Sequence, residues 1–333
     1  MTNAVGVVNT ALGAGVLVLG AIGAWALGVL LPWPDPLLIA VVIGLLLGNV
    51  VGIPQRLEPG IQTHGLWLSA GIVLMGASVS LGALLDGGPI VLVLVVGTVI
   101  LTLLVLEATA RTAFEIHEEL GSLLAAGTGI CGVSAIAAVA GSIDADEETI
   151  AYAAGTVLLF DTVTLALYPA LGSALAIPEQ VFGIWAGLSM FSTGPVVAAG
   201  FSYSELAGQW ATITKLGRNA LIGLVVLVYA AYYARRGTDG NAGAAALWAE
   251  FPTFVIGFLV LAVAATAGLL SADQVQFLET TYDWLFLIAF VGLGTELRRS
   301  VFVRGGKAPV VVVLLTWAVV ASMTLSVTWA LFG

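Results

Sequence analysis

Long apolar runs dominate this sequence and limit what the chain can fold into. Stretches of about 20 residues rich in Val, Leu, Ala and Gly follow one another with short charged loops between them, and a helix needs about that length to cross the hydrocarbon core of a membrane. Only 9% of the residues are charged, against about 25% in soluble domains. We therefore expect an all-α polytopic membrane protein, and a soluble enzyme or a disordered protein is excluded.

The number of membrane spans and their orientation follow from the loops. About eleven apolar runs are bounded by charges, prolines and glycines, and this number places eight of the ten basic residues on one side. The positive-inside rule makes that side cytoplasmic, so we expect a cell-membrane protein with a cytoplasmic N-terminus and an extracellular C-terminus. Ten spans are the alternative, if one run is re-entrant. The runs are residues 4–31, 37–54, 66–85, 89–110, 120–141, 149–172, 180–200, 212–234, 251–270, 278–297 and 308–332.

Charge and cysteine content exclude further classes. The formal net charge is -10, so the chain lacks the basic surface that nucleic acid requires as a partner. Cys131 is the only cysteine, and no cofactor or metal site is expected. Ser134 has no intramembrane histidine to act as its base, so an enzyme is not expected either.

A weak internal repeat suggests two inverted halves. The stretch from Val73 to Pro89 resembles the stretch from Val291 to Pro309, with glycines at matching positions. The two stretches belong to runs that cross in opposite directions, as in transporters with inverted repeats. We predict one integral membrane transporter domain over 1–333, with halves of approximately 36–172 and 180–332. Chance similarity between glycine-rich stretches is the alternative.

A glycine-rich segment in the fifth run is the strongest candidate for chemistry. Gly127, Gly129 and Gly132 each cost about 1 kcal/mol in a helix interior relative to Ala, so we expect an unwound centre. Unwound backbone at membrane depth must face protein or a water-filled cavity, and a helix restarting near Gly132 would direct free N–H groups at an anion. The alternative is close helix packing. The predicted binding residues are Thr128, Gly129, Ile130, Cys131, Gly132 and Ser134.

A second segment, at the end of the seventh run, also favours irregular backbone. Pro195 has no N–H and cannot bond the carbonyl of Phe191, and hydroxyl side chains precede it. We predict that this segment forms the facing half of the same site. The alternatives are a simple proline kink and the tapered end of the seventh run. The residues concerned are Ser192, Thr193, Gly194 and Pro195.

Three ionisable residues fall within apolar runs, where charge is expensive and indicates function. Asp161 lies about halfway along the sixth run, and it is predicted to carry a coupling proton or sodium ion, or to pair with a buried cation. Lys215 and Arg218 lie one helical turn apart. They either attract an anion to the site or extend to the lipid headgroups.

Several of these motifs together resemble one family. The segment from Gly129 to Ile136 reads GICGVSAI, an acidic loop follows, and the next run ends at Leu167-Tyr168-Pro169. With GIVLMG from Gly71 and KLGR from Lys215, this pattern resembles the YeiH-type sulfate exporter family. The resemblance implies a relative of the sodium/proton antiporters and bile-acid symporters. It also implies two discontinuous helices crossing at the membrane midplane, core and panel subdomains, and elevator-like motion.

The function expected from these observations is secondary active transport of a small anion. The resemblance implies sulfate or an organosulfonate as the substrate, with proton or sodium coupling. Alternatives are a passive anion channel, whose constriction would be the glycine-rich segments, and a sodium-coupled carrier of another small organic anion. Beyond the substrate and the lipid bilayer, the GxxxG motifs permit a homodimer.

Overall fold

The computed structural model of the chain describes all residues except 1, 31–35, 79–80, 144, 235–253 and 297–306. The described residues form helices and connecting turns, and no strand occurs among them. They group into two compact units, each of which contains segments from both predicted halves. The first unit is Met1–Asp86 with Thr253–Arg299, and the second is Gly87–Pro252 with Ser300–Gly333. Some charged loop residues and two matching glycines of the predicted repeat lie outside the described residues: Asp144, Arg235, Arg236, Arg298, Arg299, Arg304, Gly305 and Gly306.

Six helical segments in the described part of the chain are long and apolar enough to cross a membrane. This agrees with the expected class, an all-α membrane protein, while the count of eleven spans and the inverted repeat stay predictions. Several of the remaining helices are shorter because their runs are interrupted. The six segments are Gly6–Leu30, Gly88–Thr112, Glu148–Ala174, Glu205–Tyr233, Ala272–Glu296 and Lys307–Phe332.

The first unit is built around helix α15, which packs against α2, α4 and α1. Glycines allow these helices to touch backbone to backbone: a Cβ at Gly44 or Gly294 would collide with main-chain atoms of the other helix. Close packing through small residues is typical of membrane helices. The unit comprises α1 (Thr2–Leu30), α2 (Pro36–Leu46) with π-helical η1 (Leu47–Val51), α3 (Glu58–Ile61), α4 (His64–Met75) with 3₁₀ turn η2 (Gly76–Ser78), α14 (Phe254–Thr266) and α15 (Ala272–Glu296).

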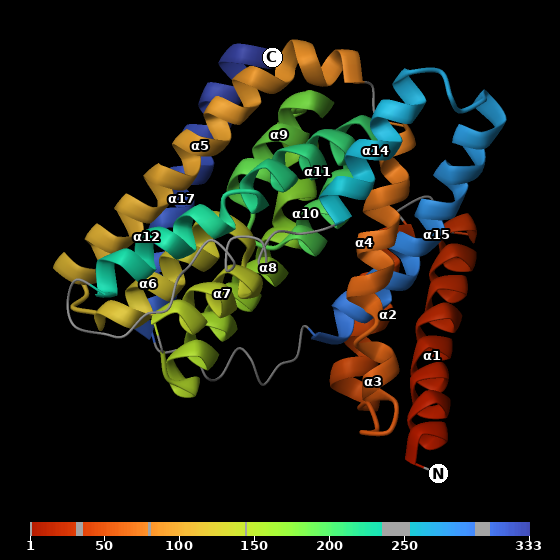
Figure 1. Ribbon diagram of the computed structural model, residues 1–333, viewed down its shortest axis with the longest axis horizontal. Coiled ribbons are helices and arrows are strands. Elements are labelled where there is room, and N and C mark those ends of the chain that lie inside the picture. Colours follow the sequence, from red (N-terminus) through yellow and green to blue (C-terminus); the bar gives the residue numbers. More distant parts are fainter. Residues whose placement is uncertain (1, 31–35, 79–80, 144, 235–253, 297–306) are drawn as a thin grey trace. The chain divides into compact units, whose positions relative to one another are not determined.

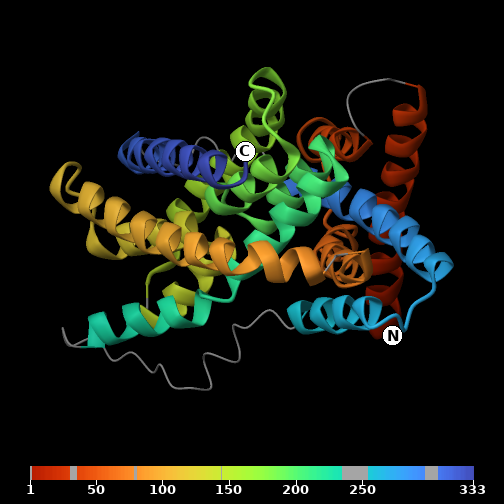
Figure 2. The same cartoon turned by 90° about the horizontal axis from the view of Figure 1, so that it is seen from above.

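The second unit holds both glycine- and proline-rich segments. Helix α9 packs against α11 and α17, and α10 packs against α11 and α8. Figures 1 and 2 show α5 running along the outside of this unit. Its helices are α5 (Leu81–Thr112, which begins at the end of the first unit), α6 (Glu118–Ala126) with π-helical η3 (Gly127–Cys131), α7 (Val133–Ile143), α8 (Glu147–Ala174), α9 (Glu179–Ser189), α10 (Thr193–Tyr203), α11 (Glu205–Asn219), α12 (Ile222–Ala234) and α17 (Lys307–Phe332).

Local sequence explains where the long helix α8 begins. The carboxylate of Asp146 accepts hydrogen bonds from the amide and the hydroxyl of Thr149, at 2.9 and 2.7 Å. This is an N-cap, which satisfies an amide left without a partner in the first turn. The hydrogen bonds from Thr149 also lower the pKa of the Asp146 carboxyl. The acidic loop before α8 therefore has a structural role in starting the helix.

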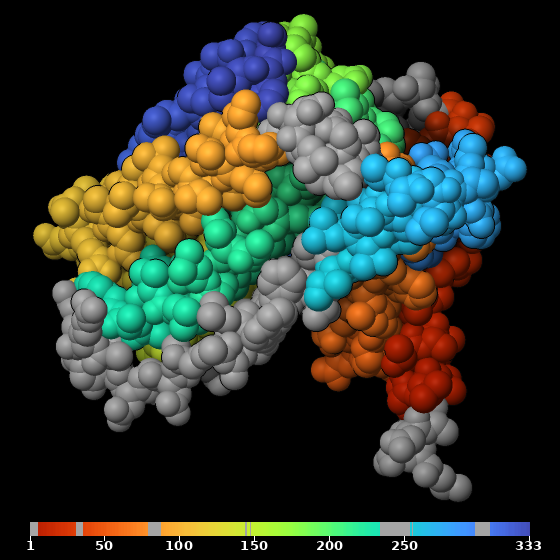
Figure 3. Space-filling view, turned by 45° about the horizontal axis from the view of Figure 1, so that its top comes forward, coloured from red at the N-terminus to blue at the C-terminus, as the bar shows by residue number. Residues whose placement is uncertain are grey.

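Apolar side chains of α5 and α12 are exposed at the surface of the second unit. Val93 is 73% exposed and Leu104 is 64% exposed on α5, while Leu224 and Val228 on α12 are each 57% exposed. The space-filling view shows both helices at the surface (Figure 3). Such a surface suits contact with lipid, because the hydrocarbon core accepts apolar side chains at no cost.

Candidate functional site: two helix breaks in the second unit

The first helix break lies where the glycine-rich segment predicted it. Helix α6 continues through the π-helical turn η3, and the chain then reverses its backbone conformation at Gly132, with φ 61° and ψ -133°. Residues with a side chain rarely adopt this conformation. Helix α7 starts at the next residue, so the run from Glu118 to Ile143 is a discontinuous helix.

The second helix break precedes Pro195. Helix α9 ends at Ser189, and Met190 and Ser192 are extended, with ψ of 164° and 154°. Helix α10 starts at Thr193, so Pro195 occupies its first turn, where a missing N–H costs nothing. The proline therefore belongs to the start of a new helix, and the proline-kink alternative is wrong.

The two breaks meet. A Cβ on Gly132 would collide with the hydroxyl of Ser192, so the first break lies directly against the second. The thiol of Cys131 is 3.3 Å from the hydroxyl of Thr193. Four residues predicted from separate runs of the sequence thus lie together.

Lys215 on α11 holds the carbonyl ends of both breaks. Its Nζ donates to the carbonyl oxygen of Ile130, 2.5 Å away, and to that of Phe191. The carbonyl oxygen of Met190 lies 3.4 Å from the same nitrogen. A helix leaves its last carbonyls without partners, and the ammonium group satisfies such carbonyls of both interrupted helices.

Arg218, one turn further along α11, does the same with its guanidinium. Nε donates to the carbonyl of Gly129 at 3.1 Å and Nη2 to that of Thr128 at 2.9 Å. Nη1 donates to the carbonyls of Gly187 and Met190, at 3.0 and 2.6 Å. The side chain is 1% exposed. Neither cation extends to a headgroup region, so that alternative is wrong.

Asp161 on α8 contacts the amide end of the second break. Its Oδ1 accepts from the amide of Ser192 at 2.9 Å, and its Oδ2 accepts from the Ser192 hydroxyl at 2.5 Å. Asp161 is 1% exposed and makes no direct ion pair with a cation among the described residues. The carboxylate therefore sits where the positive end of the α10 dipole favours a negative charge.

The remaining predicted residues lie at the edge of this arrangement. Gly194 and Pro195 are buried in the first turn of α10, and Ser134 is exposed in the first turn of α7. No side chain in the described part of the chain accepts a hydrogen bond from the first-turn amides of α7. The amide end of the first break is therefore open, whereas Asp161 occupies that of the second.

Asn219 is a residue of this site that the sequence analysis did not select. Its Nδ2 donates to the hydroxyl of Thr193 at 3.0 Å, and it is 3% exposed. Its Oδ1 and the hydroxyl of Thr128 are buried without a hydrogen-bond partner in the structure. The sequence did contain a signal for Asn219. It directly follows Arg218 in an apolar run, and polar residues at membrane depth indicate function.

Comparison with known proteins gives the family. The profile of the family described as conserved hypothetical protein 698 matches residues 11–313. The chain belongs to this family. The match includes both breaks, Asp161 and the two cations of α11, so the whole arrangement lies inside the region that defines membership.

Relatives are described as membrane proteins. One UPF0324 membrane protein from Nitratidesulfovibrio vulgaris is 33% identical over 79% of this chain and 74% of its own length. Another from Clostridium tetani is 30% identical over 82% of each chain. The UPF0324 membrane protein TauZ of Paracoccus denitrificans is 32% identical over 81% of each chain. No solved structure matches significantly.

Proposed function

We propose that this protein is a secondary active transporter of a small anion, bound where the two helix breaks meet. The buried charges carry the proposal. Asp161, Lys215 and Arg218 are each at most 1% exposed, and two cations with one carboxylate leave a net positive charge. Buried charge costs several kcal/mol per ion in real proteins. A bound anion would offset this charge.

The open amide end of α7 supports the same location. Anions bind at helix N-termini because the free N–H groups and the helix dipole both favour negative charge. Ser134 adds a hydroxyl in that first turn, and Cys131 and Thr193 lie on the adjoining side of the break. Lys215 and Arg218 would act on the anion through their charge, since their donors already bind carbonyls.

For the substrate, we propose sulfate or an anionic organosulfonate such as isethionate. The resemblance of the GICGVSAI segment to the YeiH-type sulfate exporters supports this class, as does the preference of clustered N–H and hydroxyl donors for oxyanions. We place the protein in the cell membrane with its N-terminus in the cytoplasm, because the basic loop residues segregate to one side.

We also propose that Asp161 carries the coupling ion. A proton or sodium ion on the carboxylate would add positive charge to the site, so the cation and the anion would each increase the affinity of the other, as linkage requires. With a proton as the coupling ion, substrate affinity rises as the pH falls. With sodium, affinity rises with sodium concentration at constant pH.

Counterflow in proteoliposomes tests the proposal. Vesicles loaded with unlabelled sulfate or isethionate should accumulate the labelled anion with saturable kinetics, whereas a channel would conduct current without saturation. The Ser134→Ala variant should raise the half-saturation concentration. The matched control is Ser142→Ala, at the other end of α7, where the hydroxyl bonds the carbonyl of Val139. Counterflow that is absent for every oxyanion tested would contradict anion transport.

The Asp161→Asn variant tests the coupling separately. The amide keeps an oxygen that can accept from the Ser192 amide, so the local fold is retained, but it cannot take up a proton or balance the charge of sodium. We expect substrate binding to lose its dependence on pH or sodium. Transport by Asp161→Asn that keeps the same dependence would show that Asp161 is not the coupling residue.

A further inference from the structure

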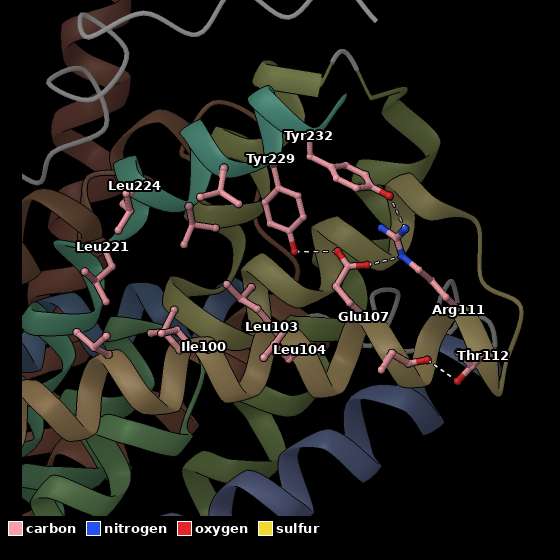
Figure 4. Close-up of a pocket in the computed structure, with 15 residues that line it drawn as sticks. Ile100, Leu103, Leu104, Glu107, Arg111, Thr112, Leu221, Leu224, Tyr229 and Tyr232 are labelled. Atoms are coloured by element: carbon pink, nitrogen blue, oxygen red, sulfur yellow. Dashed lines mark hydrogen bonds and ion pairs between the residues drawn. The ribbon is translucent and has the colours of Figure 1, made fainter. Parts of the chain in front are cut away.

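A cavity between α5 and α12 in the second unit is separate from the helix breaks. It has a volume of about 700 Å³. Residues of α5 between Val96 and Thr112 line one side, and Leu221 with residues of α12 between Leu224 and Tyr232 line the other. Figure 4 shows Ile100, Leu103 and Leu104 facing Leu221 and Leu224 across it. Most of its lining is aliphatic, so its ligand must be largely apolar.

One end of the cavity is polar. Glu107 accepts hydrogen bonds from Arg111 Nε at 2.7 Å and from the hydroxyls of Ser122 and Tyr229, at 2.8 and 2.9 Å. Arg111 Nη1 donates to the hydroxyl of Tyr232 at 2.8 Å (Figure 4). The Glu107 carboxylate is thus fully hydrogen-bonded. The cavity, called the groove below, ends in this hydrogen-bonded cluster.

Arg111 keeps donors for a ligand at this end. Its Nε binds Glu107, and its Nη1 binds Tyr232 and, at 3.4 Å, the carboxylate of Glu118. Its Nη2 donates to none of the residues that the structure describes. The side chain is 28% exposed. A guanidinium presents its N–H groups in a fork that fits phosphate oxygens, so the ligand should bring acceptor oxygens to this end and an apolar chain to the rest.

The dimensions of the groove match one lipid chain in one leaflet. From Val96 to Glu107, α5 rises about 16 Å at 1.5 Å per residue, and one leaflet contributes about 15 Å of hydrocarbon. Both lining helices belong to segments long and apolar enough to span a membrane. The polar end falls near the end of such a segment, at Thr112, which is where headgroups lie.

We propose that this groove binds a membrane glycerophospholipid, with one acyl chain between α5 and α12 and its phosphate at Arg111. The lipid reaches the site from the bilayer, because the groove is open to the surface: its lining residues Leu104 and Leu224 are 64% and 57% exposed. Binding depends on the phosphate and the chain together, so phospholipids with different headgroups should all bind, and a neutral lipid without phosphate should bind more weakly.

Photocrosslinking of the purified protein in detergent micelles without other phospholipid tests the site. A trace of phosphatidylglycerol with a diazirine in its acyl chain should label peptides from the groove faces of α5 and α12. Excess unlabelled phosphatidylglycerol should reduce this labelling about fivefold or more, as competition at a defined site requires, and diacylglycerol should compete poorly. Labelling that does not saturate would show ordinary boundary lipid only and would overturn the proposal.

Paired tryptophan substitutions separate the groove from the general lipid-facing surface. Leu104→Trp fills the groove, whereas Val93→Trp changes an exposed residue of the same helix that does not line it. Groove labelling should fall about fivefold or more in the first variant and stay unchanged in the second. Leu224→Trp on α12 repeats the test if Leu104→Trp does not fold. Equal labelling in the groove and control variants would contradict a specific lipid site.

Discussion

The two helix breaks of the second unit have similar carbonyl ends and different amide ends. Lys215 and Arg218 donate to carbonyls of both, at Ile130 and Gly129 in the first break and at Phe191 and Met190 in the second. The amide end of the second break is held by Asp161, whereas no described side chain holds that of the first. Described side chains therefore bind three of the four helix ends at the breaks: both carbonyl ends and the amide end of the second break. The amide end of the first break, at the start of α7, is available to a ligand.

The backbones of the breaks differ for reasons visible in their sequences. The first uses a π-helical turn and a positive φ at Gly132, which only glycine adopts readily. The second uses extended residues and restarts with Pro195 in the first turn of α10. The glycine permits the closest contact, because the Ser192 hydroxyl occupies the space that a Cβ would need.

Removal of Arg218, one of the two cations shared by the breaks, should have the largest effect on stability. Arg218→Leu leaves the carbonyls of Thr128, Gly129 and Gly187 buried without this donor, and each unsatisfied buried group costs about 1–3 kcal/mol. We expect a loss of at least about 3 kcal/mol in the free energy of unfolding, measured by denaturant titration in detergent. Lys307→Leu is the control, since Lys307 is exposed. Equal stability of the two variants would show that the cation is not needed at the breaks.

Two glycines of the first break should respond differently to alanine. Gly132→Ala must place a side chain at φ 61° and against Ser192, and strain of this kind costs about 1–3 kcal/mol before the collision is counted. Gly129→Ala meets the side chains of Leu103, at 3.5 Å, and Thr102, at 3.7 Å, which are ordinary contact distances. It should change stability by less than about 1 kcal/mol. Thermal unfolding of both variants decides the matter. A tolerated Gly132→Ala would mean that the break relaxes into another backbone conformation.

Serine-to-alanine variants distinguish the closed amide end from the open one. Ser192→Ala removes the hydrogen bond to Asp161, and a hydrogen bond to a charged group contributes about 1.5–3 kcal/mol. Ser134→Ala, at an exposed position, should change stability by less than about 0.5 kcal/mol while weakening anion binding. Stability and anion-induced thermal shifts are measured on both. The comparison fails if Ser134→Ala destabilises as much as Ser192→Ala.

Alkylation should show the smallest difference. Cys131 is 8% exposed and should react slowly with a small maleimide. A cysteine placed by Ser134→Cys in a Cys131→Ala background should react faster, because Ser134 is exposed and thiolate access controls the rate. Saturating sulfate should slow the second reaction, as read by mass spectrometry. A Ser134→Cys thiol that sulfate does not protect would place the anion elsewhere.

The positions of both breaks could be predicted from the sequence, but the hydrogen bonds that join the two breaks could not. Clustered glycines and Pro195 predict interrupted helices because their backbone costs are local. The partners of Lys215 and Arg218 lie far along the chain, between Thr128 and Phe191, and periodicity carries no information about which distant carbonyls a cation meets. Asn219 was missed for the same reason, since its bond to Thr193 depends on how α11 packs against α10.

Helix α11 also links the two breaks through its hydrogen bonds, so that they can move only together. Lys215 and Arg218 stand one turn apart, and each donates to carbonyls of both breaks. A hydrogen bond tolerates only a few tenths of an ångström of stretch, so neither break can shift without rupturing bonds to the other. Any motion that moves a bound anion must therefore move both interrupted helices and α11 together, as a single rigid body.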